Sequence, residues 1–363
     1  MMSKLYSLWF KNVLLRDDIK KELITNFNSF KRLYDAGLEE YIKRGFSGEV
    51  YHRISQSKSN IDDLKFKIES CEKYGVNIVD YLDDIYPKYL KQIPDPPMVI
   101  YVKGKMELLA VPTVAIVGSR NCTEYGYTTT VKIASELASS GVIIISGMAL
   151  GIDAAAHYGA MKTGSTIAVL GSGVNRCYPA SNHKIYEEIL EKGCIISEYD
   201  IEENPKPYYF PRRNRIISGM STCVVVTEAN VRSGSLITAK LALDYGRDVC
   251  AIPGNINRRL SLGTNSLIKN GAKCITNTDD IVEELPIDIR IKYEIIKKNS
   301  TKNDYELAQH ESIVYAYVSR EPILLDEIVN STQLSYIEIY EELLKLEIKG
   351  FIKKLPGERY VRV

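Results

Sequence analysis

The chain lacks the sequence features that mark several broad classes of protein. It has one tryptophan and four histidines among 363 residues, and its seven cysteines are scattered with no Cys-x-x-Cys pair. Structural zinc sites and disulfide frameworks both need cysteines or histidines at closer, regular spacings. We therefore expect no metal site, and we expect reduced cysteines in a cytoplasmic protein.

Long apolar runs and an excess of charge of one sign are also missing. The longest uncharged apolar stretch, Leu137–Ile152, is 16 residues long, whereas a membrane helix needs ~20. The short apolar run Leu5–Phe10 lies between lysines and does not resemble a secretory signal. With 47 Lys+Arg and 46 Asp+Glu, the net charge is +1. This balance excludes a generally basic coat, so we expect no membrane partner and any anion site must be built locally.

The residues that are present divide the chain into zones. Residues 1–75 are predicted to form a small N-terminal helical domain, because apolar residues recur at spacings of three and four. These residues include Leu5, Leu8, Trp9, Leu23, Phe27, Phe30 and Leu33. Gly37 and Gly45 separate short helices, a pattern that resembles SAM or helix-hairpin-helix domains. Residues 76–111 contain Ile93-Pro94-Asp95-Pro96-Pro97, and we expect them to be an extended connector leading into the core.

Residues 112–285 show a different pattern, in which short β-branched runs alternate with helical stretches. The predicted strands are Thr113–Val117, Val142–Ser146, Thr166–Leu170, Cys194–Ser197, Cys223–Thr227, Asp248–Ile252 and Lys273–Ile275. Continuous apolar strands separated by helices indicate a mostly parallel sheet covered on both faces. We therefore predict an α/β fold, an extended Rossmann-like doubly wound domain, with its ligand beyond the carboxyl ends of the strands.

The C-terminal part reads as a linker followed by a winged helix. Residues 286–305 are polar, without a long apolar period, and are predicted to be the linker. Residues 306–363 give three helices and then a hairpin around Pro356-Gly357, which is the order of a winged-helix domain. This domain has seven Lys+Arg and ten Asp+Glu. A net-acidic winged helix is a poor phosphate binder, which favours a protein-contact or regulatory role.

Three loops that follow predicted strands suit an anion. Gly118-Ser119-Arg120 combines a glycine turn, a helix N-terminus and a guanidinium, although a tight turn with Arg120 in a surface ion pair is an equal alternative. Ser233-Gly234-Ser235 opens another helix. Gly171-Ser172-Gly173 lacks the third glycine of the dinucleotide fingerprint, so we expect no nicotinamide cofactor.

Four polar residues near these loops are better explained as structural than as catalytic. Asp153 and His157 lie four apart and could form a general base, but an ordinary structural pair is favoured. Ser181 or Asn182 is a candidate N-cap, which places Lys184 in the first helical turn, where Lys184 binds phosphate or is simply solvated. Glu228 has no obvious second carboxylate for glycosidic chemistry, so we expect it to hold an arginine or backbone N–H groups.

The densest cationic segment is 206–215, with four cations and three aromatics in ten residues. It lies in a domain whose residues 112–284 carry 17 basic and 17 acidic side chains. Arginines bind phosphates and aromatic rings stack on bases. The alternative is that Tyr208, Tyr209 and Phe210 anchor the core and that one arginine pairs with a buried acid.

Taken together, the motifs closely resemble those of the DNA-processing protein DprA family, also called Smf. They occur in order over residues 80–285 as Val114–Arg120, Ser146–Asp153 with His157, Tyr178-Pro179 with Asn182, Phe210–Gly219, Thr227–Ala229, Arg232–Ala239, Gly246-Arg247, Ile252–Gly254 and Gly263–Asn265. The resemblance implies a homodimer, not an enzyme, that binds and protects single-stranded DNA. It also implies that the protein helps to load the recombinase RecA in natural transformation or homologous recombination.

The resemblance further implies that the arginine of the Gly-Ser-Arg turn, Arg120, contacts DNA, with Lys184, Arg212 and Arg213 as candidates on neighbouring loops. We therefore predict a nucleic-acid site with no catalytic residue, no cofactor and no metal. The predicted DNA-contacting residues are Gly118, Ser119, Arg120, Gly171, Gly173, Lys184, Arg212, Arg213, Arg215, Ser233, Gly234 and Ser235. The predicted structural residues beside them are Asp153, His157, Asn182 and Glu228.

Two other functions remain open from the sequence. One is a Rossmann-like hydrolase that cleaves a nucleoside monophosphate at its glycosidic bond. Such sites need a Pro-Gly-Gly-x-Gly-Thr loop, which the comparable segment Glu228–Ser235 lacks. The other is an interaction scaffold with a vestigial nucleotide pocket.

Overall fold

The computed structural model describes residues 2–59, 61–303, 309–319, 321–332 and 334–362. It divides into two compact units, residues 1–294 and 295–363. The first unit begins with six helices, α1 (Met2–Asn12), α2 (Asp17–Phe27), α3 (Phe30–Asp35), α4 (Leu38–Lys43), α5 (Gly48–Gln56) and α6 (Ile61–Lys73). The apolar residues that predicted these helices are buried, which confirms the helical pattern.

The centre of the first unit is a nine-stranded sheet with the order β1-β2-β6-β5-β4-β3-β7-β8-β9. Its strands are β1 (Val76–Asp80), β2 (Val99–Gly104), β3 (Thr113–Val117), β4 (Ile143–Ser146), β5 (Thr166–Val169), β6 (Cys194–Ser197), β7 (Ser221–Val226), β8 (Asp248–Ala251) and β9 (Lys273–Cys274). Strands β3 to β9 pair with one another in parallel. The predicted doubly wound, mostly parallel sheet is confirmed.

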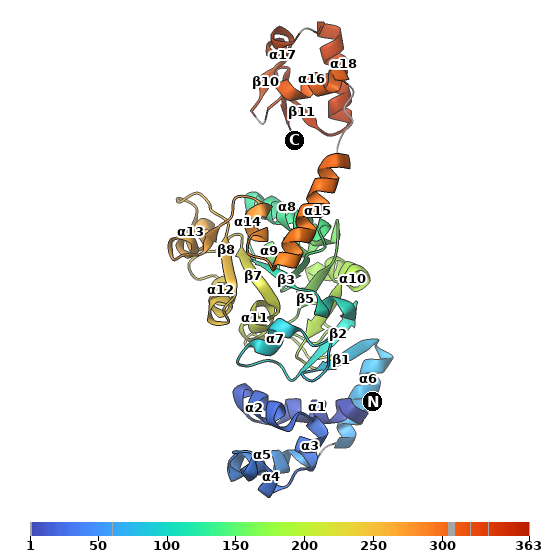
Figure 1. Ribbon diagram of the computed structural model, residues 1–363, viewed down its shortest axis with the longest axis vertical. Coiled ribbons are helices and arrows are strands. Elements are labelled where there is room, and N and C mark those ends of the chain that lie inside the picture. The colour runs from blue at the N-terminus through green and yellow to red at the C-terminus, as the bar shows by residue number, and fades with distance from the viewer. Residues whose placement is uncertain (1, 60, 304–308, 320, 333, 363) are drawn as a thin grey trace. The chain divides into compact units, whose positions relative to one another are not determined.

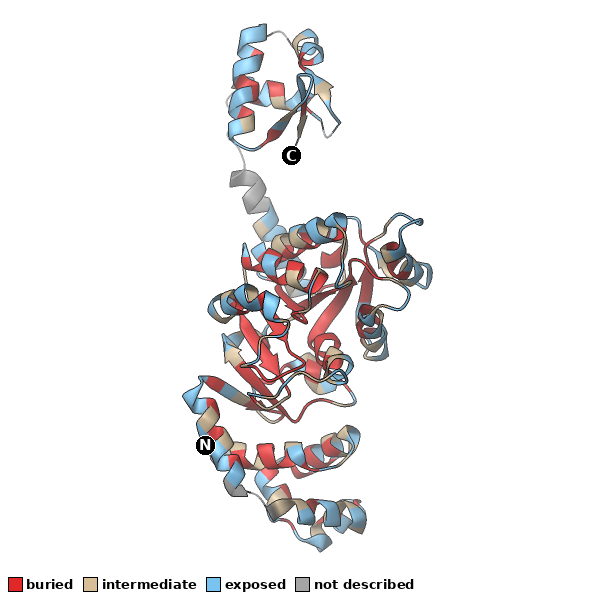
Figure 2. Cartoon of the chain, turned by 180° about the vertical axis from the view of Figure 1, so that it is seen from behind, coloured by how far each residue is buried: buried red, intermediate tan, exposed pale blue. Residues whose placement is uncertain are grey.

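Helices cover both faces of this sheet, so its strands are buried while the outer helix faces are exposed (Figure 2). The helices are α7 (Lys88–Gln92), α8 (Glu124–Ser139), α9 (Ile152–Met161), α10 (His183–Lys192), α11 (Tyr209–Met220), α12 (Gly234–Asp244), α13 (Leu262–Lys269) and α14 (Thr278–Val282). Two apolar clusters, one on each side of the sheet, form the core. A parallel sheet needs this double cover because neither of its faces is polar.

Residues 76–111, predicted as an extended connector, are instead an integral part of the sheet. β1 pairs antiparallel with β2, and β2 pairs antiparallel with β6. The N-terminal helices lie beside this edge (Figure 1) and share its apolar core. Lys4 also pairs with Asp80 at 2.9 Å. The prolines led to the connector prediction, yet Pro87 stands at the start of α7 and the others occupy the loop between α7 and β2. None lies within a strand, which leaves β1 and β2 free to donate ladder hydrogen bonds.

The predicted linker at residues 286–305 also differs, because α15 spans Ile287–Asn303; residues 304 and 305 lie outside the described part. Tyr293 is buried in the core with Ile289 packed beside it, and the Tyr293 hydroxyl donates to Asp279 at 2.9 Å. These two apolar residues are four apart and fix the start of the helix on the first unit. The polar composition of the segment concealed this short apolar pair.

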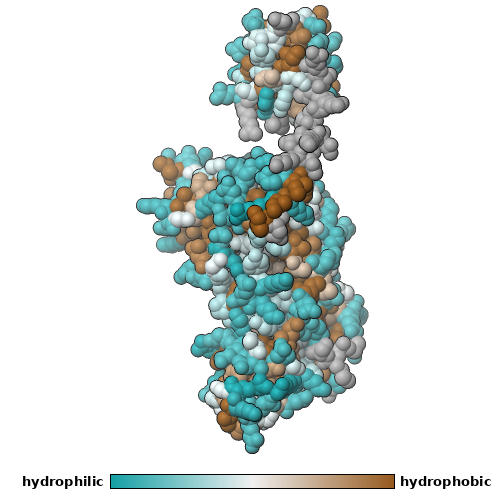
Figure 3. Space-filling model, viewed as in Figure 1, coloured by the Kyte–Doolittle hydropathy of each residue, from teal (hydrophilic) through white to brown (hydrophobic). Residues whose placement is uncertain are grey.

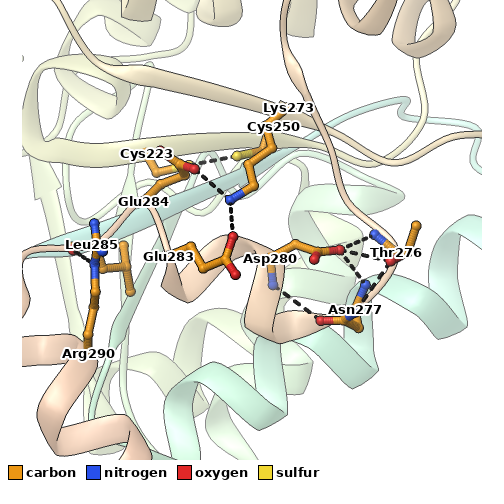
Figure 4. Close-up of polar contacts among 10 residues, drawn as sticks. All are labelled: Cys223, Cys250, Lys273, Thr276, Asn277, Asp280, Glu283, Glu284, Leu285 and Arg290. Carbon is orange, nitrogen blue, oxygen red and sulfur yellow. Dashed lines mark hydrogen bonds and ion pairs between the residues drawn. The ribbon is translucent and has the colours of Figure 1, made fainter.

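The β9–α14 segment beside α15 is held by local ion pairs and a capping box (Figure 4). Lys273 Nζ lies 2.7 Å from Glu283 and 2.6 Å from Glu284. Asn277 and Asp280 cap the start of α14 by reciprocal hydrogen bonds. Cys223 and Cys250 lie on neighbouring strands with their sulfurs 3.3 Å apart, and all seven cysteines are free.

The second unit has the predicted order of a winged helix. It contains α16 (Gln309–Tyr317), β10 (Ile323–Leu324), α17 (Leu325–Ser331), α18 (Tyr336–Ile348), β11 (Ile352–Leu355) and β12 (Arg359–Arg362). The strands form a separate sheet with the order β10-β12-β11. Its own apolar core includes Leu325, Ile328, Ile339 and Leu343. Within the described part of the chain, no helix combines the length and the apolar character needed to cross a bilayer.

Candidate nucleic-acid interface

The strand order reverses between β3 and β7, and a cavity of about 760 Å³ opens at that point. In a doubly wound sheet, the loops on the two sides of such a reversal diverge and leave a crevice beyond the carboxyl ends of the strands. The loops after β3, β4 and β7 and the first turns of α11 and α12 all line the cavity. The fold therefore brings together two of the three predicted anion-binding loops, Gly118-Ser119-Arg120 and Ser233-Gly234-Ser235, whereas Gly171-Ser172-Gly173 does not line the cavity.

The loop after β3 supplies Gly118, Ser119 and Arg120, as predicted. The Ser119 N–H donates to the carbonyl of Glu228 at 2.7 Å, and the Ile152 N–H donates to the carbonyl of Ser119 at 3.1 Å, which fixes the loop between its two neighbours. The Arg120 side chain is exposed, with its guanidinium 5.8 Å from the centre of the Phe210 ring. Among the described residues it forms no ion pair, so the alternative of a structural ion pair for Arg120 finds no partner.

A second arginine, Arg213 on α11, lines the cavity with a buried side chain and not an exposed one. It donates to the carbonyl oxygens of Gly147 and Val169. Burial lowers the pKa of Arg213 to about 10, while the neighbouring carboxylate of Asp153 opposes that shift. The two backbone carbonyls fix the orientation of this guanidinium. Because Arg213 also lines the cavity, its positive charge acts on whatever the cavity holds.

The start of α12 lies on the other side of the cavity. Ser233, Gly234 and Ser235 line it, and the Ser233 hydroxyl oxygen accepts from the Ser235 N–H at 3.4 Å. The first N–H groups of a helix and its dipole favour an anion at this place. The structure thus assembles the predicted Ser-Gly-Ser cradle opposite Arg120.

Two further arginines line the cavity, and our sequence-based site did not include them. Arg232 precedes the Ser-Gly-Ser turn, and Arg259 follows β8; both side chains are exposed. No ion pair joins either of them to a carboxylate in the part of the chain that the structure describes. The sequence held a signal for each of them. Arg232 directly precedes the predicted Ser233-Gly234-Ser235 loop, and Arg259 belongs to a pair of arginines that follows Pro253-Gly254.

Aromatic rings form one wall of the cavity. Phe210 and Tyr178 both line it, with ring centroids 5.4 Å apart. A Cβ on Gly171 would lie 2.8 Å from the Phe210 ring, so Gly171 makes room for that ring instead of contacting a ligand. Tyr209 stacks on Tyr199 at 3.7 Å and Tyr208 is exposed, but neither lines the cavity. The rings available for stacking there are Phe210 and Tyr178.

Arg212 and Arg215 do not line the cavity, and their ion pairs fit the alternative in which an arginine of this segment pairs with a buried acid. Arg212 pairs with Asp17 of α2 at 3.1 Å and with Glu198 at 3.4 Å. Arg215 is 4% exposed and pairs with Glu198 and Asp95. Successive residues of a helix point in different directions, so only Arg213 of these three faces the cavity.

Lys184 and Gly173 also lie outside the residues that line the cavity. Lys184 is exposed in the first turn of α10, so its contact with DNA stays a prediction about the rim. A Cβ on Gly173 would lie 2.3 Å from the carbonyl oxygen of Asp200. That close backbone approach gives Gly173 a packing role.

The four residues expected to be structural have clear partners. Glu228 accepts from the Thr123 N–H at 2.8 Å and from the Thr123 hydroxyl at 2.6 Å, which anchors the start of α8. Asn182 occupies the N-cap position of α10, as expected, but its side chain makes no capping hydrogen bond. It donates to the carbonyls of Met148 and Ala149 instead.

Asp153 and His157 are not paired with each other, contrary to our expectation. Asp153 Oδ2 accepts from the Ala149 N–H at 3.3 Å, and burial raises the pKa of the Asp153 carboxyl. His157 Nδ1 lies 2.7 Å from the Thr166 hydroxyl, and burial lowers the pKa of His157 to about 3. Across the described residues, no cluster of three metal-binding side chains is found.

Comparison with known proteins identifies the family. Residues 77–286 match the model of the DNA recombination-mediator protein A family, and residues 298–358 match a DprA winged helix domain. A protein Smf of Synechocystis is 35% identical over 350 residues, which is 88% of each chain. The DNA processing protein DprA of Streptococcus pneumoniae is 45% identical over 204 residues, covering 56% of this chain and 72% of that relative.

Solved structures agree with this assignment. The X-ray structure of DprA from Streptococcus pneumoniae aligns with a TM-score of 0.67 and 35% identity, covering 79% of this chain and 99% of that one. A structure of DNA processing protein A from Helicobacter pylori, described by its single-stranded DNA binding mode, aligns with a TM-score of 0.52 and 33% identity over 62% of this chain and 96% of that one. With the sheet, the winged helix and the ordered motifs in agreement, this chain belongs to the DNA recombination-mediator protein A family, the DprA family of DNA-processing proteins.

Proposed function

We propose that this protein binds single-stranded DNA in the arginine-lined cavity, without strong sequence preference. The observation that carries the proposal is the convergence of Arg120, Arg232 and Arg259, all exposed and all without an ion pair among the described residues, on one cavity. Arginine guanidiniums bind phosphate oxygens in a bidentate way. Guanidiniums already neutralised by carboxylates would offer far less attraction to a strand.

The parts of the cavity suit the parts of a nucleotide strand. Phosphates would lie at the start of α12 and against the three exposed arginines, while the Phe210 ring stacks on a base. Stacking and phosphate contacts do not read base edges, so we expect affinity for many sequences. Because the surrounding domain has no excess charge, binding depends on these few close contacts.

The similarity to the Helicobacter pylori protein supports the ligand, because that relative is described by its single-stranded DNA binding mode. We further propose that the protein protects single strands and helps to load RecA on them in natural transformation or homologous recombination. We also propose a homodimer formed through the middle domain, where Leu262 is exposed at the start of α13 near the β9 edge.

We assign no catalytic step to the cavity. In the rival function, a nucleoside-monophosphate hydrolase, the glutamate after β7 would act on the glycosidic bond. Here both carboxylate oxygens of Glu228 accept hydrogen bonds from Thr123. A Cβ on Gly126 would lie 2.4 Å from this carboxylate, so the group is enclosed by the start of α8.

The test measures fluorescence anisotropy of labelled single strands of mixed sequence and of oligo-dT, beside the matching duplex. We expect similar affinity for both single strands, weaker binding of the duplex, and no release of base from nucleoside monophosphates. Tight binding of only one sequence, or turnover of a nucleotide, would contradict the proposal. A sedimentation series that shows only monomer at micromolar concentration would remove the dimer.

A further inference from the structure

Helix α18 of the winged-helix unit has one apolar face in the core and a second one exposed. Ile339, Leu343 and Leu346 are fully buried in the unit. Ile337, Leu344 and Ile348 point the other way, with exposed fractions of 70%, 51% and 77%. Apolar surface is visible on this unit in Figure 3. A helix that packs on one side only does not need this second stripe.

Two charged residues lie on the same exposed face. Glu341 and Lys345 are exposed and stand one turn apart, between Ile337 and Ile348. Within the described residues Glu341 forms no ion pair, and Lys345 Nζ lies 2.8 Å from Glu342 on its own helix. The face therefore reads apolar, acidic, apolar, basic, apolar along the helix.

This order is complementary to itself when it is reversed. If two copies of α18 pack antiparallel about a twofold axis near residue 343, Glu341 of each copy faces Lys345 of the other. The same axis places Ile337 of one copy beside the Ile348-Lys349 end of the other helix, and the two Leu344 side chains lie about one residue to either side of the centre. An isologous contact needs a surface that is complementary to its own copy after a twofold rotation. Glu341 and Lys345 meet this need because residues at i and i+4 lie on the same face of a helix.

We propose that the exposed face of α18 is a self-association surface that binds α18 of a second copy of this chain, antiparallel, through Glu341–Lys345 pairs around an apolar centre. The observation that decides between occupants is the alternation of charge. The acidic winged-helix unit would repel a DNA backbone. A surface that binds a basic helix of another protein would carry carboxylates such as Glu341 but no lysine such as Lys345.

This surface lies outside the DNA cavity and outside the middle-domain dimer proposed above, and it does not depend on either. If the middle domains pair, α18 joins dimers into tetramers; if they do not, α18 alone forms the dimer. In both cases the α18 contact raises the weight-average mass of the particles as the protein concentration increases. Its loss therefore lowers the weight-average mass of the full-length protein without abolishing DNA binding.

The experiment uses two full-length variants, Glu341→Lys and Lys345→Glu, followed by sedimentation velocity over a concentration series. Each variant alone faces two like charges across the axis, and we expect its association constant for the α18 contact to fall about tenfold or more. An equimolar mixture of the two restores every opposite-charge pair. We therefore expect the mixture to recover the association of the unmodified protein.

Glu321→Lys is the matched control, because it makes the same change of charge at an exposed residue of the same unit but off α18. Leu344→Asp is a further variant, which removes the apolar centre and should also lower the mass. Circular dichroism confirms that each variant is folded. If Glu341→Lys sediments like the unmodified protein, or if the mixture stays as dissociated as either variant alone, the proposal is overturned. Binding of a separate basic protein to α18 would be lost in Glu341→Lys and would not return on mixing.

Discussion

The Arg120→Ala substitution tests DNA binding separately from stability. Arg120 is exposed and makes no ion pair among the described residues. Its nearest aromatic contact is the Phe210 ring at 5.8 Å. Removing an exposed side chain of this kind changes the free energy of unfolding by no more than ~0.5 kcal/mol. The melting temperature should therefore stay nearly constant.

The effect on DNA binding should be much larger. A hydrogen bond to a charged group contributes ~1.5–3 kcal/mol, and the exposed position of Arg120 favours the low end, which is roughly tenfold in Kd. If three phosphates are neutralised by Arg120, Arg232 and Arg259, the slope of log K against log salt should be about −2. The Arg120→Ala variant should have a slope smaller in magnitude by ~0.7, with the same loss for every sequence.

Anisotropy titrations over a salt series, run beside a thermal melt of each variant, measure both quantities. Lys132→Ala is the matched control because it also removes one cation from an exposed side chain that does not line the cavity. Arg213→Ala gives the contrasting result, since this buried guanidinium holds two backbone carbonyls and its loss should destabilise the fold by ~3 kcal/mol or more. An Arg120→Ala variant that is folded and binds DNA as tightly as the unmodified protein would refute the assignment of the cavity.

Three further predictions concern the rest of the chain. Burial lowers the pKa of His157 to about 3 from ~6.5 in an unfolded chain, so the unfolded state takes up a proton first and stability is lost as the pH falls below 6.5. At pH 5 this loss is about 2 kcal/mol relative to neutral pH, and urea titrations should show that His157→Gln reduces it; an equal pH dependence in both proteins would contradict the assignment. Ending the chain after Glu294 keeps Tyr293 in its core. This truncation should change the Kd for single-stranded DNA by less than about tenfold, or ~1.4 kcal/mol. A larger loss of affinity in a folded protein would show that the winged helix binds DNA. Glu228→Ala should lower the free energy of unfolding by ~1–3 kcal/mol, because the Thr123 N–H and hydroxyl lose their acceptor, and chemical denaturation measures this; unchanged stability would show that the helix anchor is unimportant.

The sequence alone determined the class of the fold and the loops of the site. Continuous β-branched strands separated by helices left a parallel sheet as the consistent arrangement, because only a doubly covered sheet buries such strands on both faces. The glycines and serines of Gly118-Ser119 and Ser233-Gly234-Ser235 marked two loops that the structure brings to one cavity. Both signals are local, since they depend on residues within one turn or one strand.

The tertiary structure decided which cations face the ligand. Arg212, Arg213 and Arg215 look alike in the sequence, yet Glu198 and Asp17 hold Arg212, Glu198 and Asp95 hold Arg215, and only Arg213 lines the cavity. These acids come from distant parts of the chain, so no local pattern reveals them. Arg259 joins the cavity for the same reason, because the carbonyl of the next residue, Leu260, accepts from the N–H of the distant Ala229 at 2.7 Å. A strand order with its reversal between β3 and β7 is a property of the whole sheet, and it places the site where the local motifs alone could not.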